Sequence, residues 1–322
     1  MRIPISAAIL LLASSLTAQR QFRVLSEDSV PGYSYTFFPH FSPDLKSSAS
    51  LDNGALVIHT VATAQEKRVA VGCILFGEAS WSSDGRFVFY VCLRQEGAAV
   101  KRFSSFELRR YDLQTGQTDS PFSQVRGYPQ PSPNGENLSF HGGPSIMLAD
   151  ANGKAPRPMS GGAFIAPEGW NADGSAILVR SARSHRLSLL SIADGSIKQL
   201  APLPPDADFY SPEWLADGSG FFFILFSEAD SRRYRASLWT DAFYTWRDGQ
   251  VWFCPVPSGN MYQVMHSAPG YLQLGGVSPD GATLMAVRNV YPPGFWELAA
   301  GLFGQTLGHE RPTLVRLRLV AR

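Results

Sequence analysis

A short turn pattern that recurs six times constrains this 322-residue chain more than any other feature of it. Each copy runs from an aromatic or apolar residue through Ser-Pro-Asp-Gly, or a variant of it, into an apolar segment that mostly alternates with polar residues. Asp-Gly and Asn-Gly are favoured where a tight turn needs a positive φ. Alternation after such a turn predicts a strand with one buried face. The six copies centre on Asp44, Asp84, Asn134, Asp173, Asp217 and Asp280.

The spacing of the copies indicates the architecture. The intervals are 40, 50, 39, 44 and 63 residues, and a four-stranded propeller blade takes about 40–50 residues. Additional turn signals, such as Thr115-Gly116 and Asp194-Gly195, lie where a second hairpin of each blade is needed. We therefore predict an all-β fold, a six-bladed β-propeller of four-stranded antiparallel blades. The segment Trp246–Phe253 is a candidate seventh copy, and seven blades is the alternative.

The two ends of the chain suggest how the ring closes. Residues 21–26 read as a strand before the first copy, and we expect them to form the outer strand of the last blade, which removes an exposed sheet edge. Residues 1–18 have the charge, apolar run and small residues of a signal peptide, from Arg2 through Ile5–Leu12 to Ala18. Residues 19–322 are then predicted to form a single propeller domain in the periplasm or outside the cell.

Charge and cysteine content narrow the function. Only 17% of residues are charged, the net charge is +1, and no basic stripe is present, which disfavours nucleic-acid binding. No segment has the length of a transmembrane anchor, and we expect a monomer. Three cysteines give no complete disulfide framework. Cys73 and Cys92 are expected to be small buried apolar residues, with pairing left open in case their strands are adjacent.

The copies at Trp81-Ser82-Ser83-Asp84-Gly85 and Ser278-Pro279-Asp280-Gly281 resemble the TolB-type propeller repeat. The same repeat is similar to the propeller of prolyl-oligopeptidase-like enzymes, and the resemblance covers the chain from about Gln21 onward. It implies a protein-binding propeller at the cell envelope. TolB itself carries a further α/β domain before its propeller, whereas here about twenty residues separate the predicted signal from the first copy. A role in the translocation system of TolB is therefore not implied.

No catalytic motif accompanies the repeats. The chain has no Gly-x-Ser-x-Gly elbow and no pair of histidines with metal-ligand spacing, so we expect no catalytic residue, no metal site and no cofactor. Some polar residues fall on predicted innermost strands. There a hydrated channel wall is favoured over a site for a cation or a basic peptide end. The channel-lining candidates are His40, Gln130, Glu168 and Glu213.

The longest interval between copies holds a second candidate surface. Loops on a rigid scaffold commonly carry function, and arginine with aromatics is the composition of binding hot spots. The main prediction is an exported, non-enzymatic propeller that presents loops and a polar channel mouth to a protein or peptide partner. The alternative is a hydrolase or lyase that acts on a lactone or carbohydrate at the channel mouth. The partner-binding candidates in this interval are Arg232, Arg233, Tyr234, Trp239, Phe243, Tyr244 and Trp246.

Overall fold

The structure is a computed structural model that describes thirteen stretches of the chain. These are residues 20–30, 39–52, 54–95, 103–125, 130–142, 145–151, 154–159, 164–181, 186–204, 209–226, 249–267, 271–289 and 313–321. The predicted signal peptide and the partner-binding candidates in 232–246 lie outside them. Within the described residues no helix occurs that could cross a membrane.

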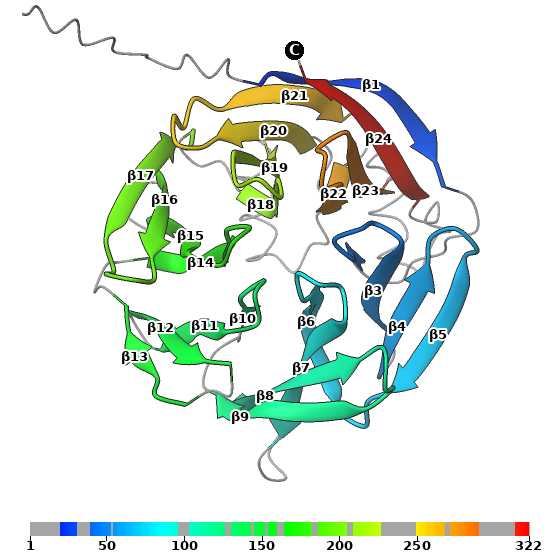
Figure 1. The fold of residues 1–322 in the computed structure, drawn as a ribbon, viewed down its shortest axis with the longest axis vertical. Coiled ribbons are helices and arrows are strands. Elements are labelled where there is room, and N and C mark those ends of the chain that lie inside the picture. The colour runs from blue at the N-terminus through cyan, green and yellow to red at the C-terminus, as the bar shows by residue number, and fades with distance from the viewer. Residues whose placement is uncertain are drawn as a thin grey trace, which may run out of the picture.

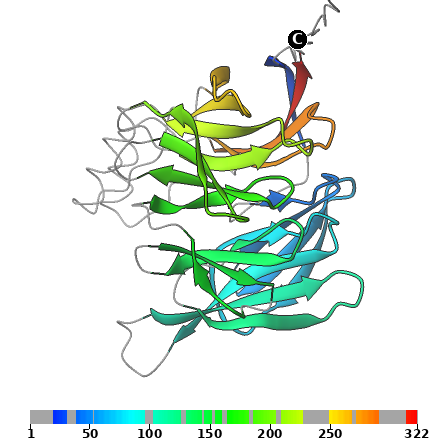
Figure 2. The same cartoon turned by 60° about the vertical axis from the view of Figure 1, so that its left-hand side comes forward.

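The described strands form six antiparallel sheets of four strands, arranged in a ring around a central axis (Figure 1). Figure 2 shows the same sheets from the side, after a turn of 60°. Five blades use consecutive strands, numbered from the innermost outward. Blade 1 contains β2 (His40–Phe41), β3 (Ser47–Asp52), β4 (Ala55–Thr60) and β5 (Gln65–Ala70). Blade 2 contains β6 (Ile74–Trp81), β7 (Phe87–Gln95), β8 (Phe103–Asp112) and β9 (Thr118–Val125).

The next three blades repeat this order. Blade 3 contains β10 (Gln130–Pro131), β11 (Asn137–Gly142), β12 (Ser145–Asp150) and β13 (Arg157–Pro158). Blade 4 contains β14 (Phe164–Trp170), β15 (Ala176–Ser181), β16 (Arg186–Ser191) and β17 (Ile197–Pro202). Blade 5 contains β18 (Phe209–Trp214), β19 (Gly220–Phe226), β20 (Gly249–Pro255) and β21 (Tyr262–Ser267).

The sixth blade joins the two ends of the chain. It contains β22 (Tyr271–Val277), β23 (Thr283–Asn289), β24 (Thr313–Ala321) and, as its outermost strand, β1 (Phe22–Ser29). β1 pairs antiparallel with β24 from Phe22↔Ala321 to Ser29↔Val315, side by side in both views (Figures 1 and 2). The predicted closure by the N-terminal strand is therefore confirmed. So are six blades, because the candidate seventh copy supplies β20 of blade 5.

The apolar core lies between neighbouring sheets. Strand β19 illustrates this, because successive side chains point to opposite faces of its sheet. One face packs toward blade 4 through Phe221, Phe223 and Leu225, and the other packs toward blade 6 through Phe222, Ile224 and Phe226. A strand buried on both faces reads as a continuous apolar run. A buried cluster of this kind occupies each of the six blade junctions.

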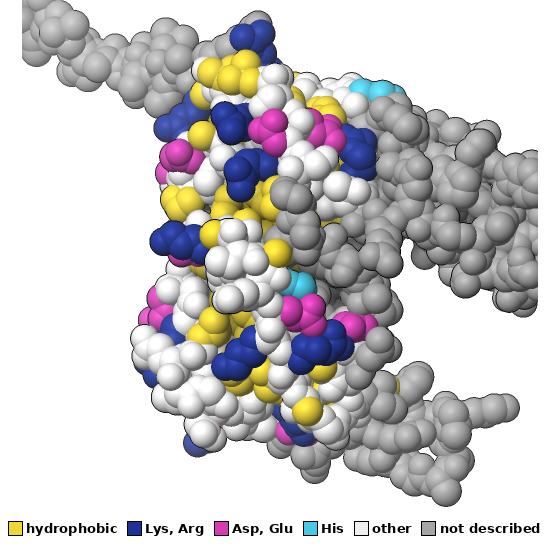
Figure 3. Space-filling model, turned by 90° about the vertical axis from the view of Figure 1, so that its right-hand side faces the viewer, with side chains coloured by type: hydrophobic (Ala, Val, Ile, Leu, Met, Phe, Trp, Pro, Cys, Tyr) yellow, Lys and Arg dark blue, Asp and Glu magenta, His cyan; other side chains and the backbone are white. Residues whose placement is uncertain are grey.

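Charges of both signs are interspersed over the outer face that carries blades 6 and 1 (Figure 3). Many form ion pairs, including Arg318 with Asp28 at 3.3 Å, where both side chains are exposed. Exposed pairs of this kind contribute little stability, typically below about 1 kcal/mol. The described residues on this face form no basic stripe in Figure 3.

Candidate functional site: the central channel

The repeated turn fixes the inner end of each blade. In the second copy the Ser82 hydroxyl donates to Asp84 Oδ1 at 2.6 Å and accepts from the Phe87 N–H at 2.9 Å. The Arg86 N–H donates to the same carboxylate at 3.0 Å. These bonds hold the pKa of Asp84 below its ordinary value, the serine bond contributing most. Equivalent bonds form at Asp44, Asn134 and Asp280.

A left-handed residue completes each turn. Five copies use glycine there, for example Gly85 at φ 70°, because a side chain is strained in this region. The first copy places Leu45 there at φ 57°. Leu45 compensates through packing, since its side chain joins the apolar cluster between blades 6 and 1.

Because the turns are equivalent, residues at one repeat position form rings around the axis. Two residues of each copy line the central cavity. One lies four positions before the turn Asp or Asn, and the other lies directly before that Asp or Asn. The first ring is His40, Ser80, Gln130, Gly169, Glu213 and Gly276. The second ring is Pro43, Ser83, Pro133, Ala172, Ala216 and Pro279. One ring thus carries polar groups, and the other is small and uncharged.

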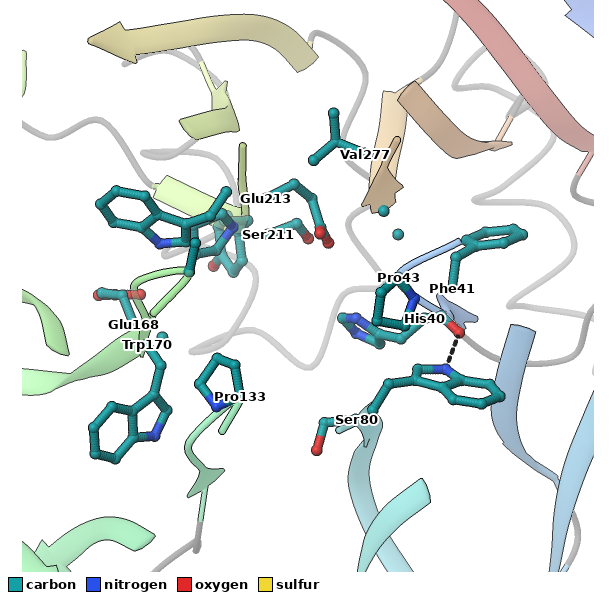
Figure 4. Close-up of a pocket in the computed structure, with 18 of the residues that line it drawn as sticks. His40, Phe41, Pro43, Ser80, Pro133, Glu168, Trp170, Ser211, Glu213 and Val277 are labelled. Atoms are coloured by element: carbon teal, nitrogen blue, oxygen red, sulfur yellow. Dashed lines mark hydrogen bonds between the residues drawn. The ribbon is translucent and has the colours of Figure 1, made fainter. Parts of the chain in front are cut away.

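The central cavity has a volume of about 840 Å³ and is lined by residues of all six blades. The four channel candidates from the sequence, His40, Gln130, Glu168 and Glu213, are all among its lining residues. In Figure 4 His40 and Glu213 extend toward the open centre from opposite sides, whereas the carboxylate of Glu168 does not. Ligand binding by these residues stays a prediction.

An ion pair explains the different orientation of Glu168. Arg180 Nε on β15 donates to Glu168 Oε1 at 2.9 Å, and both side chains are largely buried, with 17% and 13% exposed. Arg180 is the one lysine or arginine among the described lining residues, and Glu168 neutralises it.

Tryptophans join neighbouring blades at the next repeat position. The Trp81 indole N–H donates to the His40 carbonyl at 2.8 Å, the dashed line in Figure 4. The Trp170 N–H donates to the Gln130 carbonyl at 3.0 Å. Trp214 occupies the equivalent position in blade 5, but its buried Nε1 has no acceptor among the described residues. We call such a tryptophan contact between neighbouring blades a latch. The latch between blades 4 and 5 differs from the other two because it lacks the hydrogen bond.

The inner strand of blade 5 is irregular at the same place. Tyr210 pairs with Ile224 and Glu213 with Phe222, so two residues of β18 oppose one of β19. Ser211 within this bulge has φ 51°. A bulge with a strained residue commonly re-aims a side chain beside a functional site. Tyr210, Ser211 and Arg180 were not predicted as channel residues from the sequence. The only signal of the bulge in the sequence was the run of tyrosine, serine and proline directly before Glu213-Trp214.

The partner-binding candidates in 232–246 follow β19 and precede β20. β19 ends at Phe226, which lines the cavity and contacts the Tyr210 ring at a centroid distance of 5.5 Å. The described end of β19 therefore lies at the channel. The contacts of the candidates themselves are outside the described residues.

The cysteines differ from expectation. Cys73 and Cys92 form a disulfide, with Cα atoms 5.7 Å apart, because the start of β6 pairs with the end of β7. The expectation of two separate apolar thiols is wrong. Cys254 is a free, buried cysteine, and burial raises the pKa of its thiol to about 12. Among the described residues no three His, Cys, Asp or Glu side chains gather as metal ligands would.

Comparisons with known proteins agree with this architecture. No family model matches the chain, and no curated protein matches it in sequence. Among solved structures, oligogalacturonate lyase in complex with manganese has a TM-score of 0.56 and 18% identity, over 89% of this chain and 77% of that one. TolB from Acinetobacter baumannii has a TM-score of 0.52 and 16% identity, over 88% of this chain and 64% of that one. Oligogalacturonate lyase from Vibrio parahaemolyticus has a TM-score of 0.54 and 13% identity, over 88% and 77%.

The class of protein follows from the fold and these likenesses. The chain is a six-bladed β-propeller of the type found in TolB and in oligogalacturonate lyase. At these identities the likeness shows the fold alone. The particular activity has to be inferred from the channel.

Proposed function

We propose that the chain is an exported binding protein whose central channel receives a segment of a protein or peptide partner. The observation that carries this proposal is the cavity of about 840 Å³, walled by all six blades and lined by aromatic, small and few charged residues. Binding pockets are commonly concave and mostly apolar, with a few polar groups that fix orientation. The distant likeness to TolB supports the same reading.

Export has separate support. Disulfides persist in oxidising compartments and are rare in the cytosol of most organisms. The Cys73–Cys92 pair therefore favours a periplasmic or secreted location, as does the predicted signal peptide in residues 1–18.

The likeness to oligogalacturonate lyase supports a second candidate, a carbohydrate lyase. Its substrate is a polyanion, and the described lining offers one cation, Arg180, which Glu168 already neutralises. The described residues do not bring together a ligand set for manganese either. The channel's charge thus favours the binding reading. Formation of an unsaturated uronate product from oligogalacturonate with Mn²⁺ would favour the lyase instead.

A plugged channel tests the proposal. A random dodecapeptide library is selected on the immobilised protein, and the affinities of enriched peptides are measured by fluorescence anisotropy. Ser80→Trp fills the channel from β6, and Leu25→Trp adds the same side chain on the exposed bulge of β1 as a control. We expect at least a tenfold loss of affinity for the first variant and less than a twofold change for the second.

Thermal unfolding checks that both variants fold. Failure to enrich any peptide, or equal affinity of a folded Ser80→Trp variant, would contradict binding in the channel.

A further inference from the structure

Two residues of the channel wall each bury a polar atom that has no hydrogen-bond partner among the described residues, Trp214 Nε1 and Gln130 Oε1. We propose that these two side chains form a subsite for the main chain of the partner's segment. Trp214 donates to a peptide carbonyl there, and Gln130 accepts from a peptide N–H. This inference rests on the proposed function, because it names the groups that the channel recognises.

The backbone of blade 4 explains why Trp214 lacks an acceptor. The other two latch tryptophans donate to the carbonyl of the first-ring residue in the preceding blade. For Trp214 that residue is Gly169, whose φ of 152° is one that glycine adopts far more readily than other residues. The register of β14 with β15 also shifts on both sides of Pro167. The bond that the other latches form is missing at this irregular place, so the Trp214 N–H is left for another acceptor.

The two atoms are complementary to a peptide group. An indole N–H can only donate, and a side-chain amide oxygen can only accept. Neither atom carries a charge, and every non-proline residue of a polypeptide offers one uncharged donor and one uncharged acceptor on its main chain. A buried polar atom without a partner is costly, and native proteins satisfy nearly all such atoms. The main chain of a bound segment supplies both partners.

The arrangement of the strands leaves room for a main chain between the two residues. Gln130 lies on β10 of blade 3 and Trp214 on β18 of blade 5, with blade 4 between them. The first-ring residue of blade 4 is Gly169, so no side chain projects into the cavity from that position. Both Gln130 and Trp214 are only partly buried as whole residues. The terminal torsion angles of glutamine and tryptophan are soft, so a modest rotation turns each polar atom toward a guest.

Backbone analogues of an enriched dodecapeptide test this inference. A thioamide at one position replaces the carbonyl oxygen by a weaker acceptor, and an ester at one position removes one N–H. In the wild-type protein, one thioamide and one ester position should each lower affinity about fivefold. Trp214→Phe should abolish the effect of that thioamide, and Gln130→Met should abolish the effect of that ester, as in a double-mutant cycle. Gln130→Met keeps the backbone carbonyl that accepts from the Trp170 N–H.

Two matched variants serve as controls. Trp252→Phe removes an indole N–H on β20 that donates to Gln250 and is not among the described lining residues. Gln65→Leu removes a glutamine side chain from the exposed strand β5. Both should leave the affinity of the unmodified peptide within twofold and both analogue effects in place. Thermal unfolding checks that all four variants fold.

The subsite requires both couplings. The absence of a sensitive position, or an analogue effect that persists in the folded Trp214→Phe or Gln130→Met variant, would overturn it. If the enriched peptides still lose affinity with Ser80→Trp in that case, the channel function stands and only the main-chain subsite fails. If no peptide is enriched, the proposed function fails as well.

Discussion

Replacing Phe22 by alanine should destabilise the whole ring, because this side chain joins the closing strand to the neighbouring blade. Phe22 is 7% exposed, and its ring lies 5.0 Å from that of Phe222 and 4.9 Å from that of Phe253. Buried Phe→Ala substitutions cost about 3–5 kcal/mol. We expect a loss of about 4 kcal/mol in the free energy of unfolding. At an unfolding entropy of about 2.1 cal/mol/K per residue, this lowers Tm by about 6 °C.

Two further variants accompany Phe22→Ala, an exposed control on the same strand and a second test of the closure. Leu25 on the same strand is 57% exposed, and Leu25→Ala should cost less than about 0.5 kcal/mol. The Tyr262 hydroxyl accepts from the Phe22 N–H at 2.7 Å, so Tyr262→Phe leaves that N–H without its partner and should cost about 1–2 kcal/mol. Denaturant unfolding followed by tryptophan fluorescence measures all three. If the Phe22 and Leu25 variants lost equal stability, the closure would not hold the ring together as described.

Three other predictions address the latches, the turns and the cysteines. Trp170→Phe removes the N–H that donates to the Gln130 carbonyl, whereas the N–H removed by Trp214→Phe has no acceptor among the described residues. In urea unfolding, the first variant should therefore lose about 1 kcal/mol more of the free energy of unfolding than the second. Equal losses would contradict the latch. Folding lowers the pKa of Asp84 below 3.8, so its contribution to stability is present above that pH and is lost as pH falls through the folded value. Asp84→Asn should therefore flatten the loss of stability below about pH 4, and an unchanged pH profile would exclude this role. A thiol reagent should find no reactive group in the native protein and one per chain after unfolding without reduction, because Cys254 is buried with a pKa of about 12; three would exclude the disulfide.

The fold was predictable because the information for it is local and repeated. Each Ser-x-Asp-Gly turn closes through its own hydrogen bonds, as Ser82 and Asp84 show. The strand after it alternates in a way that a sequence reveals. The first copy was also recognisable although Leu45 replaces its glycine, since the neighbouring Ser42-Pro43-Asp44 is intact.

The details of the site depend on contacts between strands, which local patterns do not encode. Arg180 lies twelve residues after Glu168 and meets it because β14 and β15 pair. The Cys73–Cys92 disulfide likewise depends on the register of β6 with β7. The bulge at Ser211 changes which side chains share a face, and a one-residue shift in register cannot be read from alternation alone.

The polar groups of the channel lie on the inner strands, whereas the apolar core lies between the blades. Buried apolar clusters between the blades stabilise the ring. The loop candidates such as Trp239 and Tyr244 lie outside the described residues and stay predictions.

Hydrogen exchange with and without a selected dodecapeptide tests most directly where a partner binds. The account predicts slower exchange in segments that contain the inner strands, foremost β18 with its bulge at Ser211. Protection confined to outer strands such as β5 and β9, with the inner strands unaffected, would contradict it.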